Sequence, residues 1–316
     1  MRGRGAGDAF DSGRRDAPRN RQTTHPIPNH RLRKDSTSGA FGSTNRPGIS
    51  EGLLISTAGD INAGDSGSAV SLLFAAGRRP DAGAIRQLAE KQGGFSVSFD
   101  PVAESSSGAT APAGQGAAWL ELLANGLTFD LVGLMPGPRA EPPPCVHRYA
   151  LAAEANALDL EALTILPGPH LAGGHTMAPV IRTLAWLGAS LAELDGIEAV
   201  AWHPARSWCD PDYFRDGVLR WIEGGVFPSL GLTALAMAPD GGMQSEGLAL
   251  FTAQELRIEP ELMADKAAGA KIGVRLIDLL VEKGRIDTPQ RIVGPDGLPL
   301  RLEPSANGRF VRVWRG

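Results

Sequence analysis

The sequence predicts an α+β protein in which a mixed, largely antiparallel sheet packs against several helices. Short apolar runs typical of strands are mixed with amphipathic segments of helical spacing, and hairpin signals gather toward the C-terminus. The densest pattern is the stretch 245–280, which is typical of two short strands followed by a long amphipathic helix. Strands and helices that are mixed in this way favour α+β over a doubly wound parallel sheet.

Residues 1–66 are predicted to form a disordered basic tail in front of a globular region over 67–316. The tail is rich in Arg, Gly, Ser, Asn, Thr and Pro, and it shows almost no apolar periodicity. Such a segment cannot bury enough apolar surface to offset its chain entropy. The globular region is either one domain or two halves that meet near 139–148, where three consecutive prolines interrupt the pattern.

The predicted elements follow from local signals taken in order. Apolar runs, alternation and turn signals predict strands at 69–75, 95–99, 127–134, 197–202, 232–237, 247–251, 256–258, 291–293, 300–302 and 310–314. The run 119–123 suits either a strand or a short helix. Helical spacing and good helix formers predict helices at 81–92, 150–163, 175–193, 211–223 and 262–282. In the fourth helix Asp210 is the expected cap, Pro211 suits the first position, and Gly224-Gly225 ends it.

The charge distribution bounds the class of partner. The chain has 316 residues, of which 42% are hydrophobic and 21% charged, an ordinary globular balance. Residues 1–50 hold ten Lys and Arg against four Asp, whereas the remainder carries a net charge of −10. Phosphate backbones need clustered Lys and Arg, so an acidic body does not favour nucleic acid as a partner. A weaker third hypothesis assigns nucleic-acid binding to the basic tail alone.

Cysteine usage and hydropathy point to the cytoplasm. The chain has two cysteines, too few for a disulfide framework. No apolar run follows the basic start, so no signal peptide is predicted. No stretch approaches the roughly 20 apolar residues of a membrane helix, so no membrane partner is expected.

The best candidate for a functional pocket is a short segment that runs from the end of a strand to the start of a helix. Its residues are Trp202, His203, Trp208, Cys209 and Asp210. A cysteine close to a helix N-terminus can have its thiolate stabilised. The favoured alternative is structural: the two tryptophans anchor the core and Asp210 caps the helix.

A zinc site is a second hypothesis for the same region. Cys145, His147, His203 and Cys209 could supply two thiolates and two imidazoles, the donor set of a tetrahedral zinc centre. Their spacing matches no specific zinc motif, and a buried free cysteine often serves only as a small apolar group. Apart from zinc at this site, no cofactor is predicted.

Three further motifs are weaker. Residues 64–68, GDSGS, match the nucleophile motif of trypsin-like serine proteases, but only His25 and His30 precede Ser66, and no barrel of strands does. The loop 167–175 brings His170 and His175 to a glycine-rich helix entry without the pattern of a nucleotide loop. The acidic residues Glu255, Glu259 and Glu261 are expected to form a solvated edge rather than an acid–base pair.

Residues 245–258, SEGLALFTAQELRI, carry a GL-x-x-F step and an E-L-x-I strand ahead of a helix and a short hairpin. This segment resembles a bacterial family of domains of unknown function, and the Trp202-His-Pro-Ala segment is also similar. The resemblance lies mainly over 197–283, and Thr252 stands where that family usually has glycine. It implies a bacterial, cytoplasmic α+β protein and transfers no catalytic residue.

Two functions remain open. The first is a non-catalytic module that binds a protein or a small molecule, because the core is well patterned and no catalytic set converges in the sequence. The second is a metal-dependent hydrolase with the Cys/His site. The second requires the segments 145–147 and 203–209 to meet in space.

Overall fold

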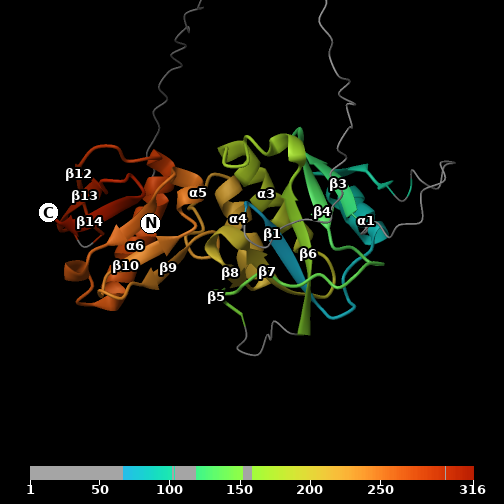
Figure 1. The fold of residues 1–316 in the computed structure, drawn as a ribbon, viewed down its shortest axis with the longest axis horizontal. Helices are drawn as coiled ribbons and strands as arrows, with labels where there is room; N and C mark the ends of the chain where they lie inside the picture. Colours follow the sequence, from blue (N-terminus) through green and yellow to red (C-terminus); the bar gives the residue numbers. More distant parts are fainter. Residues whose placement is uncertain (1–66, 102, 104–118, 152–158, 296) are drawn as a thin grey trace, which may run out of the picture. The chain divides into compact units, whose positions relative to one another are not determined.

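The computed structural model describes residues 67–101, 103, 119–151, 159–295 and 297–316. The predicted disorder of 1–66 lies outside the described residues. The described residues belong to one compact unit, Ser56–Gly316. They form helices and two mostly antiparallel sheets, which confirms the predicted α+β class, although the strands divide between two sheets (Figure 1).

The first sheet has eight strands in the order β2-β3-β4-β6-β1-β7-β8-β5. Its strands are β1 (Val70–Ala75), β2 (Ser96–Phe99), β3 (Trp119–Ala124), β4 (Leu127–Val132), β5 (His147–Tyr149), β6 (Leu160–Pro167), β7 (Ile197–Trp202) and β8 (Ser207–Cys209). All neighbours are antiparallel except β5 and β8. The proline-rich segment 139–148 does not separate two sheets, because β4 before it and β5 and β6 after it share this one.

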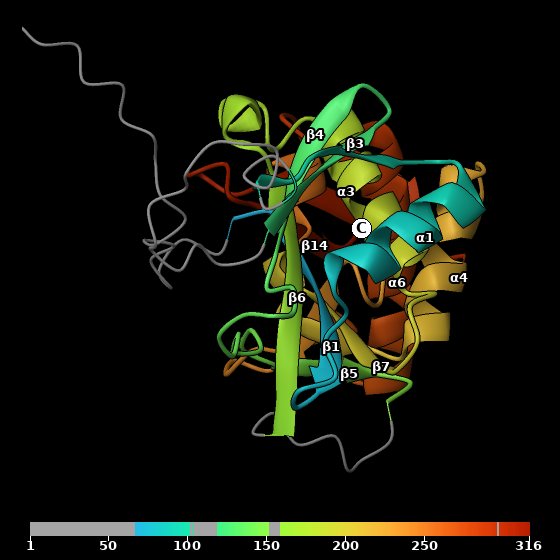
Figure 2. The same ribbon diagram turned by 90° about the vertical axis from the view of Figure 1, so that its right-hand side faces the viewer.

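Three helices cover one face of the first sheet: α1 (Ala82–Gln92), α3 (Ala178–Leu191) and α4 (Pro211–Ile222) (Figure 2). Alternate strand residues such as Leu72, Leu131 and Val200 point toward these helices and are fully buried. The opposite face holds a smaller cluster around Leu73 and Trp208, against which part of the segment 140–151 packs. The apolar core therefore lies mainly between the sheet and its helices.

The second sheet has the strand order β12-β13-β14-β11-β10-β9. Its strands are β9 (Ala234–Met237), β10 (Met243–Glu246), β11 (Glu255–Ile258), β12 (Gln290–Val293), β13 (Pro299–Pro304) and β14 (Phe310–Arg315). The long helix α6 (Lys266–Lys283) packs against it, and the short α5 (Ala249–Thr252) contacts α6. Only β11 and β14 are parallel neighbours.

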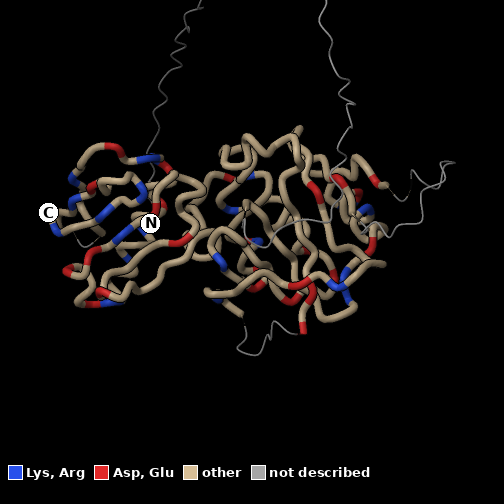
Figure 3. The backbone as a smooth tube through the Cα atoms, in the orientation of Figure 1, with Lys and Arg blue, Asp and Glu red and all other residues tan. Residues whose placement is uncertain are grey.

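Three arginines on the second sheet, Arg257, Arg301 and Arg312, are paired with acids. Figure 3 marks both basic and acidic positions along the backbone of this sheet. Arg312 Nε binds Glu259 Oε1 at 2.7 Å, and Arg257 pairs with Asp240. These ion pairs neutralise part of the positive charge of this sheet.

Two predicted elements are wrong. Residues 160–163 belong to β6 instead of the predicted helix over 150–163, because antiparallel pairing with β1 outweighs the helix propensity of Ala and Leu; residues 152–158 of that prediction lie outside the described residues. The predicted strand 247–251 contains the helical turn α5. The carboxylate of Glu255 stabilises the start of this turn, because it accepts hydrogen bonds from the N–H groups of Gly247 and Ala249, both at 3.0 Å.

Candidate functional site

The predicted pocket segment lies in the core. Trp202, Trp208 and Cys209 are 0%, 1% and 0% exposed. Asp210 is the N-cap of α4, where its Oδ1 accepts a hydrogen bond from the N–H of Tyr213 at 3.0 Å. These positions match the structural alternative for the tryptophans and for Asp210.

The side chain of His203 contacts a buried serine. Its Nε2 lies 2.8 Å from Ser71 Oγ, which also contacts Thr164 Oγ1 at 2.8 Å. Burial lowers the pKa of His203 to about 4, so the imidazole is neutral near pH 7. Ser71, the second residue of β1, is 0% exposed, so its hydroxyl is not open to solvent.

The proposed zinc ligands come from segments that do meet, since β5 and β8 pair in parallel and place Tyr149 opposite Cys209. The side chains nevertheless have separate partners. His147 Nε2 lies 3.0 Å from Glu246 Oε2, and the Cys145 thiol contacts the His147 carbonyl at 3.6 Å.

Burial also disfavours a zinc ligand at Cys209, because it raises the pKa of this thiol to about 12. In the part of the chain that the structure describes, no group of three or more His, Cys, Asp or Glu side chains could hold a metal ion. The hydrolase alternative remains a prediction, which the zinc content of the purified protein would test.

The weaker motifs have local roles where they are described. Ser66 lies outside the described residues. His175 Nδ1 lies 2.7 Å from the carbonyl of Ala172, while His170 contacts Thr128 at 3.3 Å, so the two histidines have different partners.

Of the three acidic residues expected at a solvated edge, only Glu261 is exposed. Glu255 lies in β11, which is inside the sheet between β10 and β14. Glu259 is only 4% exposed and pairs with Arg312. Burial raises the pKa of Glu255 even though its carboxylate accepts several hydrogen bonds. Glu261 accepts a hydrogen bond from the N–H of Arg315 at 2.6 Å.

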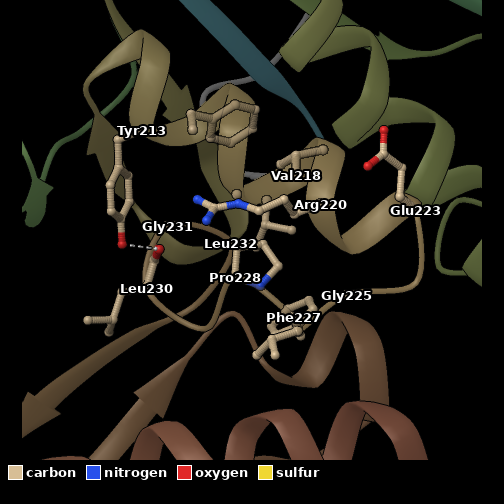
Figure 4. A pocket seen from close by; sticks show the side chains of 13 residues that line it. Tyr213, Val218, Arg220, Glu223, Gly225, Phe227, Pro228, Leu230, Gly231 and Leu232 are labelled. Atoms are coloured by element: carbon tan, nitrogen blue, oxygen red, sulfur yellow. Dashed lines mark hydrogen bonds between the residues drawn. The ribbon is translucent and has the colours of Figure 1, made fainter. Parts of the chain in front are cut away.

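A cavity of about 550 Å³ lies between α4 and the loop that follows this helix (Figure 4). Its lining begins at Tyr213, three residues after Asp210. We call residues 224–232 the cavity loop. The lining consists of Tyr213, Phe214, Gly217, Val218, Arg220, Glu223, Gly225, Val226, Phe227, Pro228, Leu230, Gly231 and Leu232. Most of these residues are apolar, so the cavity has an apolar floor with a few polar groups at its rim.

The end of α4 fixes the start of the cavity loop. The N–H of Gly224 binds the carbonyl of Trp221 at 3.0 Å, and the N–H of Gly225 binds the carbonyl of Arg220 at 2.8 Å. Gly224 has a φ of +93°, which side chains disfavour. At Gly225 a Cβ would lie 2.7 Å from the Arg220 carbonyl oxygen, so only glycine lets the chain turn this closely.

Two hydrogen bonds tie the cavity loop to α6. The N–H of Phe227 binds Asp278 Oδ1 at 3.0 Å, and Ser229 Oγ binds the carbonyl of Val274 at 3.2 Å. The ring of Phe227 also packs edge-on against Trp221, with centroids 5.2 Å apart. These contacts hold the middle of the loop in one position.

Two further bonds tie the end of the loop to the first sheet and α4. Tyr213 Oη donates to the carbonyl of Leu230 at 3.0 Å, and Ser207 Oγ donates to the carbonyl of Gly231. Burial raises the pKa of Tyr213 and so keeps the phenol protonated as a donor. Val226, in contrast, is 71% exposed at the rim. The cavity is therefore preformed, with one apolar side chain presented at its mouth.

Arg220 is the cation of this cavity. Its Nε donates to the carbonyl of Asp216 at 2.9 Å, and no carboxylate among the described residues forms an ion pair with it. In Figure 4 its guanidinium extends across the cavity on the side of Tyr213, whereas the Glu223 carboxylate points away. The two terminal nitrogens of Arg220 are thus available to an anion.

The sequence does not reveal this cavity, although the predicted pocket segment ends at Asp210, three residues before Tyr213. Gly224-Gly225 predicts only the end of a helix. The signal that could have drawn attention is the sequence 224–231, GGVFPSLG, in which apolar residues stand between glycines directly after a helix.

No protein-family model, no curated protein and no solved structure matches this chain. Among the described residues, no helix combines the length and the apolar character needed to cross a bilayer.

Proposed function

We propose that this protein is a non-catalytic binding module whose cavity beside α4 holds a small organic acid with an apolar body. The observation that carries this proposal is an apolar cavity of about 550 Å³ that is bordered by Arg220, a guanidinium with no ion pair among the described residues. Small-molecule sites typically measure roughly 300–1,000 Å³ and combine an apolar lining with a few placed polar groups.

The rim supports binding because it is already ordered. Four hydrogen bonds, at Phe227, Ser229, Leu230 and Gly231, fix the cavity loop before any ligand arrives. A ligand that enters a preformed cavity does not have to order a loop, so more of its contact energy appears as affinity.

Arg220 selects the charge of the ligand. A guanidinium binds a carboxylate through two parallel hydrogen bonds, a geometry that a lysine cannot offer. Glu223 points away, so a positively charged ligand would find no partner on this side of the rim. The floor around Phe214, Val218 and Leu232 takes the apolar body.

Isothermal titration of the full chain with octanoate and with 4-phenylbutyrate tests the proposal. We expect saturable binding of at least one acid, and at least tenfold weaker binding of octanol, which keeps the body but lacks the carboxylate. Arg220→Gln should remove this difference because it removes the charge. Arg291→Gln, an exposed arginine on β12, is the matched control and should bind as the wild type does.

Two results would overturn the proposal: an absence of saturable binding by either acid, or equal affinity of the wild type and Arg220→Gln.

We include a bacterial, cytoplasmic origin in the proposal. Two free cysteines, Cys145 and Cys209, are in keeping with a reducing compartment.

A further inference from the structure

Two other cavities meet over helix α3, on the far side of the cavity loop. One measures about 660 Å³ and lies among α3, the cavity loop, α5 and α6. The other measures about 620 Å³ and lies among α3, the β3–β4 turn and Gly94. Both are lined by Ala178 and Arg182, so these two residues form the boundary between them.

The helical spacing explains why one residue serves both cavities. Successive residues are rotated by about 100° around an α-helix. Ile181 points into the first cavity and Trp186 into the second, and Arg182 lies between these two directions. Ala178 lies one helical turn before Arg182 and is exposed. We call these two residues the ridge between the cavities. The ridge is low at Ala178 because this side chain is only a methyl group.

Arg182 is held in place, and the side chains of Asp278 and Glu282 line the same cavity. Its guanidinium lies 4.5 Å from the centre of the Trp221 ring, and one Nη donates to the carbonyl of Ile222 at 3.3 Å. No carboxylate among the described residues forms an ion pair with it. A fixed guanidinium with free donors, stacked on an aromatic ring, suits a carboxylate ligand.

Each cavity has an aromatic wall. In the first, Trp221, Phe227 and Phe251 pack edge-on against one another, with Phe227 and Phe251 centroids 4.9 Å apart. In the second, Gly94 lies directly against the Trp186 ring, where an added Cβ would be 2.6 Å from Cη2. Such walls favour apolar side chains on both flanks of the charged ridge.

We propose that these two cavities and the ridge between them bind an extended peptide segment of a partner protein. An apolar side chain of the segment enters each cavity, and an Asp or Glu between them meets Arg182. An α-helix with its side chains is about 10–12 Å across, and residues four positions apart in an extended chain are about 13 Å apart, so this spacing lets one apolar side chain enter each cavity. Positions i, i+2 and i+4 of an extended chain face the same side, which places the acid at i+2.

The probe is a set of synthetic peptides, acetyl-G-Φ-S-D-S-Φ-G-amide, in which Φ is Phe, Leu, Ile or Trp. Binding to the full chain is measured by fluorescence anisotropy with a terminal dye. We expect saturable binding of at least one peptide with a dissociation constant below about 1 mM. Replacing its Asp with Asn, or moving the Asp by one position, should weaken binding at least tenfold.

Variants of the protein separate this proposal from the acid-binding cavity. Arg182→Gln should weaken the Asp peptide at least tenfold and leave the Asn peptide unchanged, and Arg182→Lys should give an intermediate loss. Ala178→Phe raises the ridge at an exposed helix position and should abolish binding of every peptide. Arg220→Gln should leave peptide binding unchanged, because that side chain lines only the other cavity.

Several results would overturn the proposal. They are a lack of saturable binding by the whole peptide set, equal affinity of Arg182→Gln and wild type for the Asp peptide, and binding that survives Ala178→Phe. Self-association of the chain that disappears in Ala178→Phe would also overturn it, since the groove would then hold a second copy. Failure here leaves octanoate binding untouched, and failure of octanoate binding leaves the peptide result standing.

Discussion

The guanidinium groups of Arg79 and Arg220 differ in their burial and in their hydrogen-bond partners. Arg79 is 5% exposed, and its Nε lies 2.7 Å from Glu161 Oε2. Its terminal nitrogens donate to the carbonyls of Gly133, Gly137 and Pro138. Arg220 is exposed beside an apolar cavity and binds only one carbonyl, through Nε.

This difference separates structural charge from charge that is available to a ligand. A buried guanidinium is tolerated only when a carboxylate and carbonyls take up its donors, as at Arg79. A guanidinium at the surface can keep free donors at little cost because water satisfies them. When such a group borders an apolar cavity, its donors are the part of the site that gives specificity.

Replacing Arg79 should have the largest effect on stability. Burial would raise the pKa of Glu161, but the hydrogen bond and the charge of Arg79 outweigh burial and hold that pKa below its usual value. Arg79→Met removes the ion-pair partner of this buried carboxylate and leaves it only the N–H of Gly77 and the charge of Arg139, so we expect the free energy of unfolding to fall by about 3–5 kcal/mol. Urea denaturation near pH 7 measures the loss.

The double variant Arg79→Met, Glu161→Gln should recover part of that loss, because the uncompensated charge is gone. Lys91→Met is the surface control. Lys91 Nζ lies 3.6 Å from Glu193 Oε2 in an exposed pair, so this change should cost less than about 1 kcal/mol. Similar losses for Arg79→Met and Lys91→Met would contradict the distinction between a buried ion pair and one at the surface.

His203 should produce the next largest effect, in acid. Its pKa is about 4 in the folded protein and about 6.5 when unfolded, so the unfolded state takes up the proton first as the pH falls. The stabilisation is complete above about pH 6.5 and is lost as the pH falls toward about 4. We expect stability to be about 2 kcal/mol lower at about pH 5 than at about pH 7.5.

His203→Gln keeps a hydrogen-bonding group beside Ser71 but cannot take up a proton, so its stability should change much less over this range. The carboxylates of Glu161 and Glu246 have lowered pKa values and lose their stabilisation mainly below about pH 4.5, outside the window. An equal pH dependence in wild type and His203→Gln, measured by urea denaturation, would show that burial of His203 is not the cause.

The sequence predicts those elements whose signals are local. Asp210, Pro211 and Gly224 mark the two ends of α4, and the structure places the helix between them. The strand β6 was missed because its residues favour a helix, and only pairing with β1 and β4, which are distant in the sequence, makes it a strand.

The cavity could not be predicted because its shape depends on contacts between distant residues. Phe227 is tied to Asp278, 51 residues away, and Leu230 is tied back to Tyr213. The sequence shows that a loop follows the helix, but it does not show which side chains hold the loop off α4. Tryptophans and a cysteine near a helix start are a stronger sequence signal than a glycine-rich loop, and here they belong to the core.

Removal of the N-cap of α4 should have a moderate effect on stability. Asp210→Ala removes the acceptor for the Tyr213 N–H, so we expect a loss of about 1 kcal/mol in the free energy of unfolding. Asp212→Ala, an acid in the same first turn that is not the cap, should cost less than half as much. Equal losses, measured by urea denaturation, would mean that charge near the helix N-terminus matters rather than the cap.

Arg220→Gln should have the smallest effect on stability and so complete the comparison with Arg79. Its guanidinium forms no ion pair among the described residues, and its one hydrogen bond lies on the surface of α4. The free energy of unfolding should therefore change by less than about 0.5 kcal/mol, while octanoate binding weakens at least tenfold. A loss above about 1 kcal/mol in urea denaturation would show that Arg220, like Arg79, stabilises the folded protein. Surface substitutions without such a role usually change stability by less than about 0.5 kcal/mol.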